Sequence, residues 1–165
     1  MHPGWDASHI TILSQPTMPS TYLSLHYHIV FSTKNREPAI DTSWRTRLHE
    51  YLGGTVNGLS GQSEGVNGTA DHVHLLVGLK STHCLADFMR ELKKAGSIWV
   101  HDEIGLGSFA WQEGYGAFTV SPPDRKRVRN YIANQEERHR TKTFREELIE
   151  FLEAAEVDYD PKYLD

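Results

Sequence analysis

The chain has 165 residues, of which 38% are hydrophobic and 24% charged, and this favours one globular domain with a real core. A single cysteine, Cys84, excludes an internal disulfide and fits a reducing cytosol, and no segment is apolar enough to span a membrane, so we expect a cytoplasmic protein. The formal net charge of −5 does not by itself indicate a nucleic-acid-binding protein.

The first half of the chain predicts three strands and one helix. Residues 1–20 lack the features of a signal peptide and are expected to be a flexible extension. Residues 22–33 are rich in β-branched and aromatic residues and predict a strand. Residues 41–59 carry apolar side chains at helical spacing, in a helix that starts near Asp41 or Thr42 and weakens or ends at Gly53-Gly54. Within residues 58–68 we expect a short strand that turns into a strand over 69–79.

The second half predicts two helices and a fourth strand. An apolar stripe begins at Leu85 and predicts a core helix that stops at Gly105; a strand follows around residues 117–120. Residues 121–140 predict the last main helix, with Ser121 and Asp124 in a capping-box arrangement. The order matches an α+β, ferredoxin-like fold: a split β-α-β antiparallel sheet with helices on one face and an additional C-terminal helix. We expect the domain to cover residues 21–145 and an acidic tail to cover 146–165.

Two histidines interrupt the apolar strand TADHVHLLVGL. His72 and His74 are two apart, so both imidazoles face one side of the sheet while Val73 and Leu75 face the other. This geometry suits a metal ion, and it equally suits two solvated histidines on an open sheet face. Asp71 either orients one imidazole or only begins the strand.

A second histidine pair, His26 and His28, lies in the first strand, which neighbours the third in this fold. We interpret these two side chains as packing residues or as partners behind a metal ligand.

The last helix carries polar residues at helical spacing. Tyr131 and Gln135 are four apart and share one face, His139 follows four further on, and Arg138 lies beside it. One interpretation is a surface helix with a polar face. The other is that the Gln135 oxygen joins His72 and His74 around a divalent cation, and that Tyr131 attacks a phosphodiester.

Basic residues gather in the same part of the chain. They are Arg125, Lys126, Arg127, Arg129, Arg138, Arg140, Lys142 and Arg145. Such local asymmetry can provide a phosphate-binding face on an acidic protein, although a solvated helix face has the same appearance.

Several of these segments together resemble the single-tyrosine HUH transposases of the IS200-like family, which are related to the REP-associated tyrosine transposases. The resemblance covers residue 22 to the C-terminus and is carried by DHVHLLV, FAWQEGYGAFTVS, RNYIANQEERHR and VDYDPKYLD. Two departures from the family pattern are Arg138-His139, where many relatives have two adjacent histidines, and Gly68-Thr69-Ala70, where Gly-Met-Pro is usual.

The resemblance implies roles for particular positions. His72, His74 and Gln135 would be metal ligands for Mg²⁺ or Mn²⁺, and Tyr131 the nucleophile of an HUH catalytic domain that cuts and rejoins single-stranded DNA through a 5′-phosphotyrosine. It also implies recognition of DNA hairpins at insertion-sequence ends, and a homodimer in which active sites can be completed in trans. The residues expected to bind DNA are Arg125, Lys126, Arg129, Arg138 and His139.

Two other functions fit parts of the pattern. A ferredoxin-like domain without catalysis could bind nucleic acid through its basic helix and through Tyr27 or Phe31 on an open sheet. A metal-dependent phosphodiesterase that uses water would keep the histidines but would not need Tyr131.

Overall fold

The computed structural model describes residues 20–164, so almost all of the expected N-terminal extension lies outside the described residues. The strands are β1 (His26–Ser32), β2 (Gln62–Gly68), β3 (His72–Gly78) and β4 (Gly116–Thr119). The helices are α1 (Thr42–Gly58), α2 (Leu85–Trp99), α3 (Arg125–Ala133), α4 (Gln135–Arg138) and α5 (Phe144–Ala154). None of the helices formed by residues 20–164 is long and apolar enough to cross a membrane.

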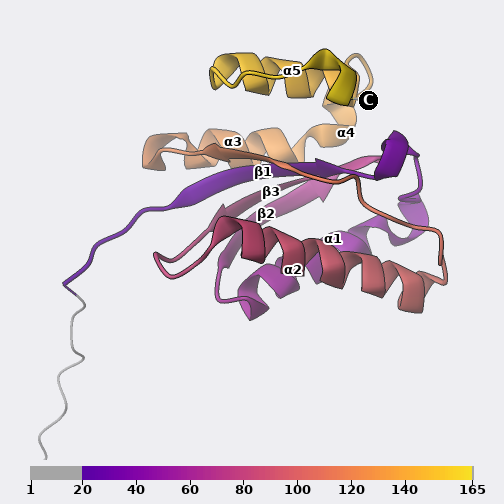
Figure 1. The fold of residues 1–165 in the computed structure, drawn as a ribbon, viewed down its shortest axis with the longest axis horizontal. Coiled ribbons are helices and arrows are strands. Elements are labelled where there is room, and N and C mark those ends of the chain that lie inside the picture. The colour runs from indigo at the N-terminus through magenta and orange to yellow at the C-terminus, as the bar shows by residue number, and fades with distance from the viewer. Residues whose placement is uncertain (1–19, 165) are drawn as a thin grey trace, which may run out of the picture.

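The strands form one antiparallel sheet in the order β2-β3-β1-β4. Helices α1 and α2 cover one face, and α3, α4 and α5 lie over the other (Figure 1). The predicted α+β, ferredoxin-like fold is confirmed, with β1 and β3 as neighbours at the centre of the sheet.

The main core lies between the sheet and the pair α1 and α2. Alternation along β3 places Val73, Leu75 and Val77 on this face, fully buried. The helices supply the other half of this core, chiefly Trp44, Leu48, Leu52, Phe88, Met89 and Leu92. The opposite face of β3 is thereby left for His72 and His74.

Helix α1 differs from its prediction at its C-terminal end. It begins as expected, with the Asp41 carboxylate accepting a hydrogen bond from the backbone N–H of Ser43 at 2.8 Å. It does not end at Gly53-Gly54 but continues to Gly58. A Cβ atom on Gly53 would lie 3.3 Å from Ser63 Oγ, so this glycine lets α1 pack closely on β2 rather than ending the helix.

The predicted last helix is broken. Asn134 leaves the helical conformation, with φ −104° and ψ 26°, and separates α3 from α4. After α4 the chain forms α5, which begins with a capping box between Thr143 and Glu146. The boundary expected between residues 145 and 146 therefore falls inside α5, and part of the expected acidic tail is a helix over the sheet (Figure 1).

Candidate metal centre and tyrosine site

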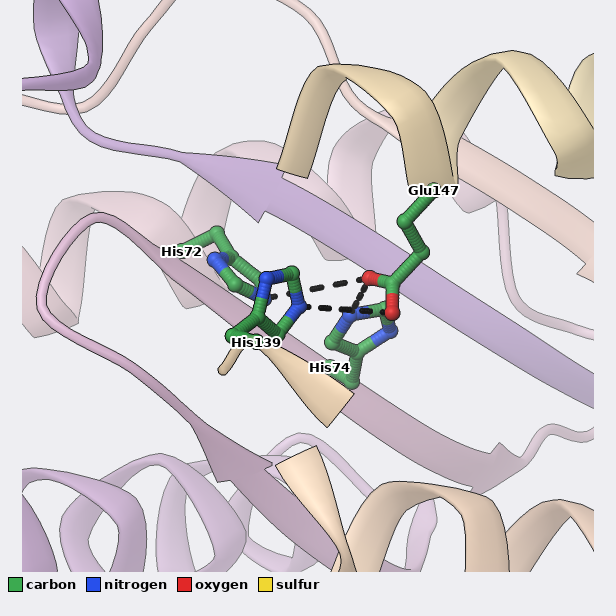
Figure 2. Close-up of side chains that lie close together, drawn as sticks. All are labelled: His72, His74, His139 and Glu147. Atoms are coloured by element: carbon green, nitrogen blue, oxygen red, sulfur yellow. Dashed lines mark hydrogen bonds and ion pairs between the residues drawn. The ribbon is translucent and has the colours of Figure 1, made fainter. Parts of the chain in front are cut away.

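The imidazoles of His72 and His74 are fully buried on the sheet face beneath α4 and α5 (Figure 2). Their ring centroids lie 5.0 Å apart with the planes at 82°. The alternation of β3 accounts for this placement, because the neighbouring Val73 and Leu75 are in the core on the other face. These are not solvated histidines on an open sheet.

Each imidazole is held by a partner at its Nδ1 atom. His72 Nδ1 donates to Asp71 Oδ1 at 2.7 Å, and His74 Nδ1 shares a hydrogen bond of 2.8 Å with His28 Nε2. Outer hydrogen bonds of this kind orient metal-binding histidines and aim their Nε2 atoms at one point. His28 thus lies behind the pair, whereas His26 lies 3.8 Å from Glu64 and outside the cluster.

Gln135 is fully buried and its side chain reaches the same point. Gln135 Oε1 lies 3.2 Å from His72 Nε2 and 3.1 Å from His139 Nε2. In the tautomer that gives its Nδ1–H to Asp71, His72 has a lone pair on Nε2, which faces an amide oxygen that is also an acceptor. Two acceptors aimed at each other fit a cation between them, which supports a metal at this position.

A carboxylate completes the cluster from α5. Glu147 Oε1 lies 2.7 Å from His74 Nε2 and 3.9 Å from His72 Nε2, and Glu147 Oε2 lies 3.3 Å from His139 Nε2 (Figure 2). One ligand atom from each of these four residues lies within 4.8 Å of the others. Sequence reasoning missed Glu147, although the capping box at Thr143 and the apolar spacing that follows it could have indicated α5.

Tyr131 joins this cluster through its hydroxyl group. The phenol on α3 donates a hydrogen bond to Glu147 Oε2. The Arg138 guanidinium lies 4.1 Å from the centre of the tyrosine ring, and Phe151 packs edge-on at 5.5 Å. Tyr131 on α3 and Gln135 at the start of α4 thus both lie against the histidine pair, and their roles as nucleophile and metal ligand remain predictions.

The electrostatics of the cluster favour a charged Glu147 and neutral His74 and His28. For His139 the effect of burial is outweighed by the Glu147 carboxylate, which raises the pKa of this imidazole above its ordinary value. Burial lowers the pKa of His74 to about 4 and that of His28 to about 3. Burial opposes the charge of Glu147, but hydrogen bonds from the surrounding imidazoles and the phenol outweigh it and hold its pKa well below the ordinary range. Burial and the adjacent carboxylate raise the pKa of the Tyr131 phenol well above its ordinary value.

The donor set fits a divalent transition metal. Imidazole nitrogens and carboxylate or amide oxygens together suit Mn²⁺ and the later first-row ions, whereas Mg²⁺ prefers oxygen ligands alone. The lowered pKa values of His74 and Glu147 favour the neutral imidazole and the ionised carboxylate that metal ligands require.

The other residues expected to bind DNA lie in different surroundings. Arg125 forms an ion pair with Glu64, while Lys126 and Arg129 are exposed on α3. Arg138 covers the tyrosine ring, and His139 belongs to the buried cluster. These expected DNA contacts remain predictions.

The alternative that used stacking on an open sheet is wrong for Phe31. This side chain is 2% exposed and packs edge-on against Trp111 within the core, at a centroid distance of 4.8 Å. Tyr27 also packs against that core. Both residues lie on the sheet face that packs against α1 and α2, so neither stands on an open sheet face.

Comparison with known proteins identifies the family. The family described as "Transposase IS200 like" matches residues 21–135, and the chain belongs to it. The transposase for insertion sequence element IS200 from Salmonella typhimurium strain LT2 is 25% identical over 127 residues, covering 73% of this chain and 83% of that protein. The same element's transposase from Salmonella typhi matches equally.

Two solved structures share the fold. One is a Deinococcus radiodurans R1 protein assigned as a transposase, with a TM-score of 0.57 and 25% identity, covering 70% of this chain and 94% of that one. The other is a REP-associated tyrosine transposase bound to a REP hairpin, with a TM-score of 0.55 and 16% identity. The match covers 72% of this chain and 71% of that one. At that identity the second likeness concerns the fold alone.

Proposed function

We propose that this transposase cuts and rejoins single-stranded DNA at insertion-sequence ends through a 5′-phosphotyrosine formed on Tyr131. The observation that carries the proposal is the convergence of the Tyr131 phenol with the His72–His74 pair on one carboxylate, Glu147. A phenol beside a cluster of metal-ligand type is the equipment that phosphoryl transfer to tyrosine requires. Family membership supplies DNA transposition as the setting.

His72, His74 and Gln135 would hold a Mg²⁺ or Mn²⁺ ion, with Glu147 Oε1 as a further ligand. When bound, such an ion polarises the scissile phosphate and stabilises the departing oxygen. Asp71 and His28 keep the imidazoles in place from behind. The protein's own contribution is therefore a rigid set of metal-ligand atoms carried by strand β3 and helices α4 and α5.

In the cleavage step the Tyr131 O–H bond breaks as the phenolic oxygen attacks phosphorus, and the hydrogen bond to Glu147 Oε2 orients the phenol for this attack. The bond from phosphorus to the 3′ oxygen breaks, and the phenol proton passes through water to that oxygen, which leaves as a free 3′ hydroxyl. Rejoining reverses these steps: a 3′ hydroxyl attacks the phosphotyrosine, and its proton returns to the released phenolic oxygen. The link to tyrosine conserves the phosphodiester bond, which hydrolysis would lose.

The partner proposed is single-stranded DNA with hairpin ends, as the REP-hairpin complex of the similar structure suggests. Action on chromosomal DNA would place the protein in the cytoplasm. One chain brings Tyr131 and the imidazoles together, and a homodimer could also exchange them. Mixing Tyr131→Phe with His74→Ala protein distinguishes the two arrangements, because recovered cleavage requires a site completed in trans.

The experiment that tests the function uses end-labelled single strands from both flanks of the gene, incubated with protein and Mn²⁺. A labelled product that stays with the protein in a denaturing gel, and is absent for Tyr131→Phe, supports the proposal. Tyr51→Phe, on the far side of the sheet, is the matched control and should retain the product. An equal adduct with Tyr131→Phe, or free ends without any adduct, contradicts it.

A further inference from the structure

A groove of about 1230 Å³ opens beside Tyr131 and borders the buried histidine cluster through His28. It lies between α3 and α5, over the edge of the sheet formed by β1 and β4. Its lining includes Phe118, Lys126, Arg127, Tyr131, Arg138 and Phe151. The groove extends beyond the phenol of Tyr131 and is large enough for more than one phosphate.

The floor of the groove is apolar and aromatic. Phe118 on β4 stacks on Phe151 of α5, with ring centroids 5.6 Å apart and planes at 26°. Val157 adds an apolar side chain that is 46% exposed at the groove wall. Aromatic and apolar surfaces of this kind bind unpaired bases of any sequence, since every base has a π face. A base paired within a duplex cannot offer that face.

The walls of the groove are basic in a protein of net charge −5. Lys126, Arg127 and Arg138 line it, and the described lining residues include no carboxylate. Asp124 lies 3.4 Å from Arg127 at the rim and offsets part of that charge. Cations along an aromatic floor complement a phosphate backbone with exposed bases, and this combination marks single-stranded nucleic acid rather than a peptide or a membrane.

We propose that this groove binds the single-stranded DNA adjoining the phosphate presented to Tyr131, with bases on the Phe118–Phe151 floor and phosphates at Lys126 and Arg127. Lys126 precedes Tyr131 by five residues on α3, about 7.5 Å along the axis at 1.5 Å per residue. That length matches about two stacked nucleotides at 3.4 Å each. The chemistry at the end of the groove rests on the proposed function, but the binding does not.

The test measures the binding of the full chain to fluorescein-labelled oligothymidylate by anisotropy, in EDTA so that no cleavage occurs. Lys126→Ala should reduce the slope of log K against log salt by about 0.7, the value for one phosphate contact on a single strand. The matched control is Lys94→Ala, an exposed lysine of α2 on the other side of the sheet, and its slope should not change. A second pair adds one negative charge to each face: Ala154→Glu at the groove wall should weaken binding, and Ala86→Glu on α2 should not.

The outcomes separate this proposal from the proposed function. If the Tyr131 adduct forms but Lys126→Ala and Ala154→Glu bind as their controls do, the groove assignment is wrong and the chemistry stands. If no adduct forms but both groove variants bind more weakly than their controls, the groove is supported and the chemistry is wrong. Equal binding of blunt duplex and single strand overturns the assignment. A change in sedimentation of the groove variants would instead assign the groove to a second copy of the chain.

Discussion

The phenol of Tyr131 on α3 and the carboxylate of Glu147 on α5 are joined by a hydrogen bond across the face of the sheet. The same carboxylate contacts His74 Nε2 at 2.7 Å, so the expected nucleophile and the expected metal ligands meet at one side chain. Its two oxygens have different neighbours: Oε1 faces the histidine pair and Oε2 faces the phenol and His139. Helix α5 is therefore part of the site and not only a cover over it.

Replacement of Glu147 by glutamine should weaken the binding of Mn²⁺ about tenfold or more, because a charged ligand becomes a neutral amide. Isothermal titration with the metal alone measures this without any reaction. Glu150→Gln is the matched control, since Glu150 is an exposed residue of α5 that pairs with Lys142. Equal affinities of the two variants would exclude Glu147 from the ligand set.

Asp71 should act on metal affinity through His72. Its carboxylate accepts the Nδ1 hydrogen at 2.7 Å and leaves the Nε2 lone pair directed into the cluster. Asp71→Ala removes this acceptor and should lower Mn²⁺ affinity about 10- to 100-fold. Asp71→Asn keeps a neutral acceptor and should lower the affinity for Mn²⁺ by a smaller factor. If both variants bind Mn²⁺ like the original protein, Asp71 only begins the strand.

Much of the site could be predicted from the sequence because its spacings are local. A spacing of two on a strand places His72 and His74 on one face, and this rule acts within one element. The spacing of four between Tyr131 and Gln135 spans the break at Asn134, and the short turn there still leaves both side chains on the side of the sheet. The ferredoxin-like order of strands then brings the helix over the correct sheet face.

Glu147 could not be placed in this way, since its position depends on two events outside any repeat. The chain leaves the helix at Asn134, and α5 then folds back so that Phe151 packs against His28 at a centroid distance of 4.9 Å. Neither event leaves a periodic pattern, and the surrounding glutamates gave the segment the composition of a solvated tail. The predicted end of the helix at Gly53-Gly54 was wrong for a similar reason, because α1 continues to Gly58 and the close approach of Gly53 to Ser63 depends on packing between two elements.

The free energy of unfolding should fall as the pH falls, partly because of His49. This imidazole is 9% exposed, and its Nε2 atom has no hydrogen-bond partner among the described residues. Burial, with a smaller effect of Arg45, lowers the pKa of His49 from 6.5 to about 4. Between these two values the unfolded chain binds the proton and the folded chain does not, so stability present above pH 6.5 is lost towards pH 4.

For His49 this loss amounts to about 2 kcal/mol between pH 7 and pH 5. His49→Leu removes the titration and should make the decline shallower by that amount, as measured by urea denaturation at both pH values. An unchanged difference between the two pH values would show that His49 is protonated equally easily in the folded and unfolded protein.

Two helical glycines should respond to substitution in opposite ways. A Cβ on Gly54 meets nothing within 4 Å, so Gly54→Ala should raise the free energy of unfolding by up to about 1 kcal/mol through helix propensity. A Cβ on Gly96 would lie 3.0 Å from Leu52 Cδ2, where α2 packs against α1. Gly96→Val should therefore cost about 1 to 3 kcal/mol by overpacking that contact. Denaturant unfolding of the two variants checks both signs, and a stabilised Gly96→Val protein would contradict the close packing of α1 on α2.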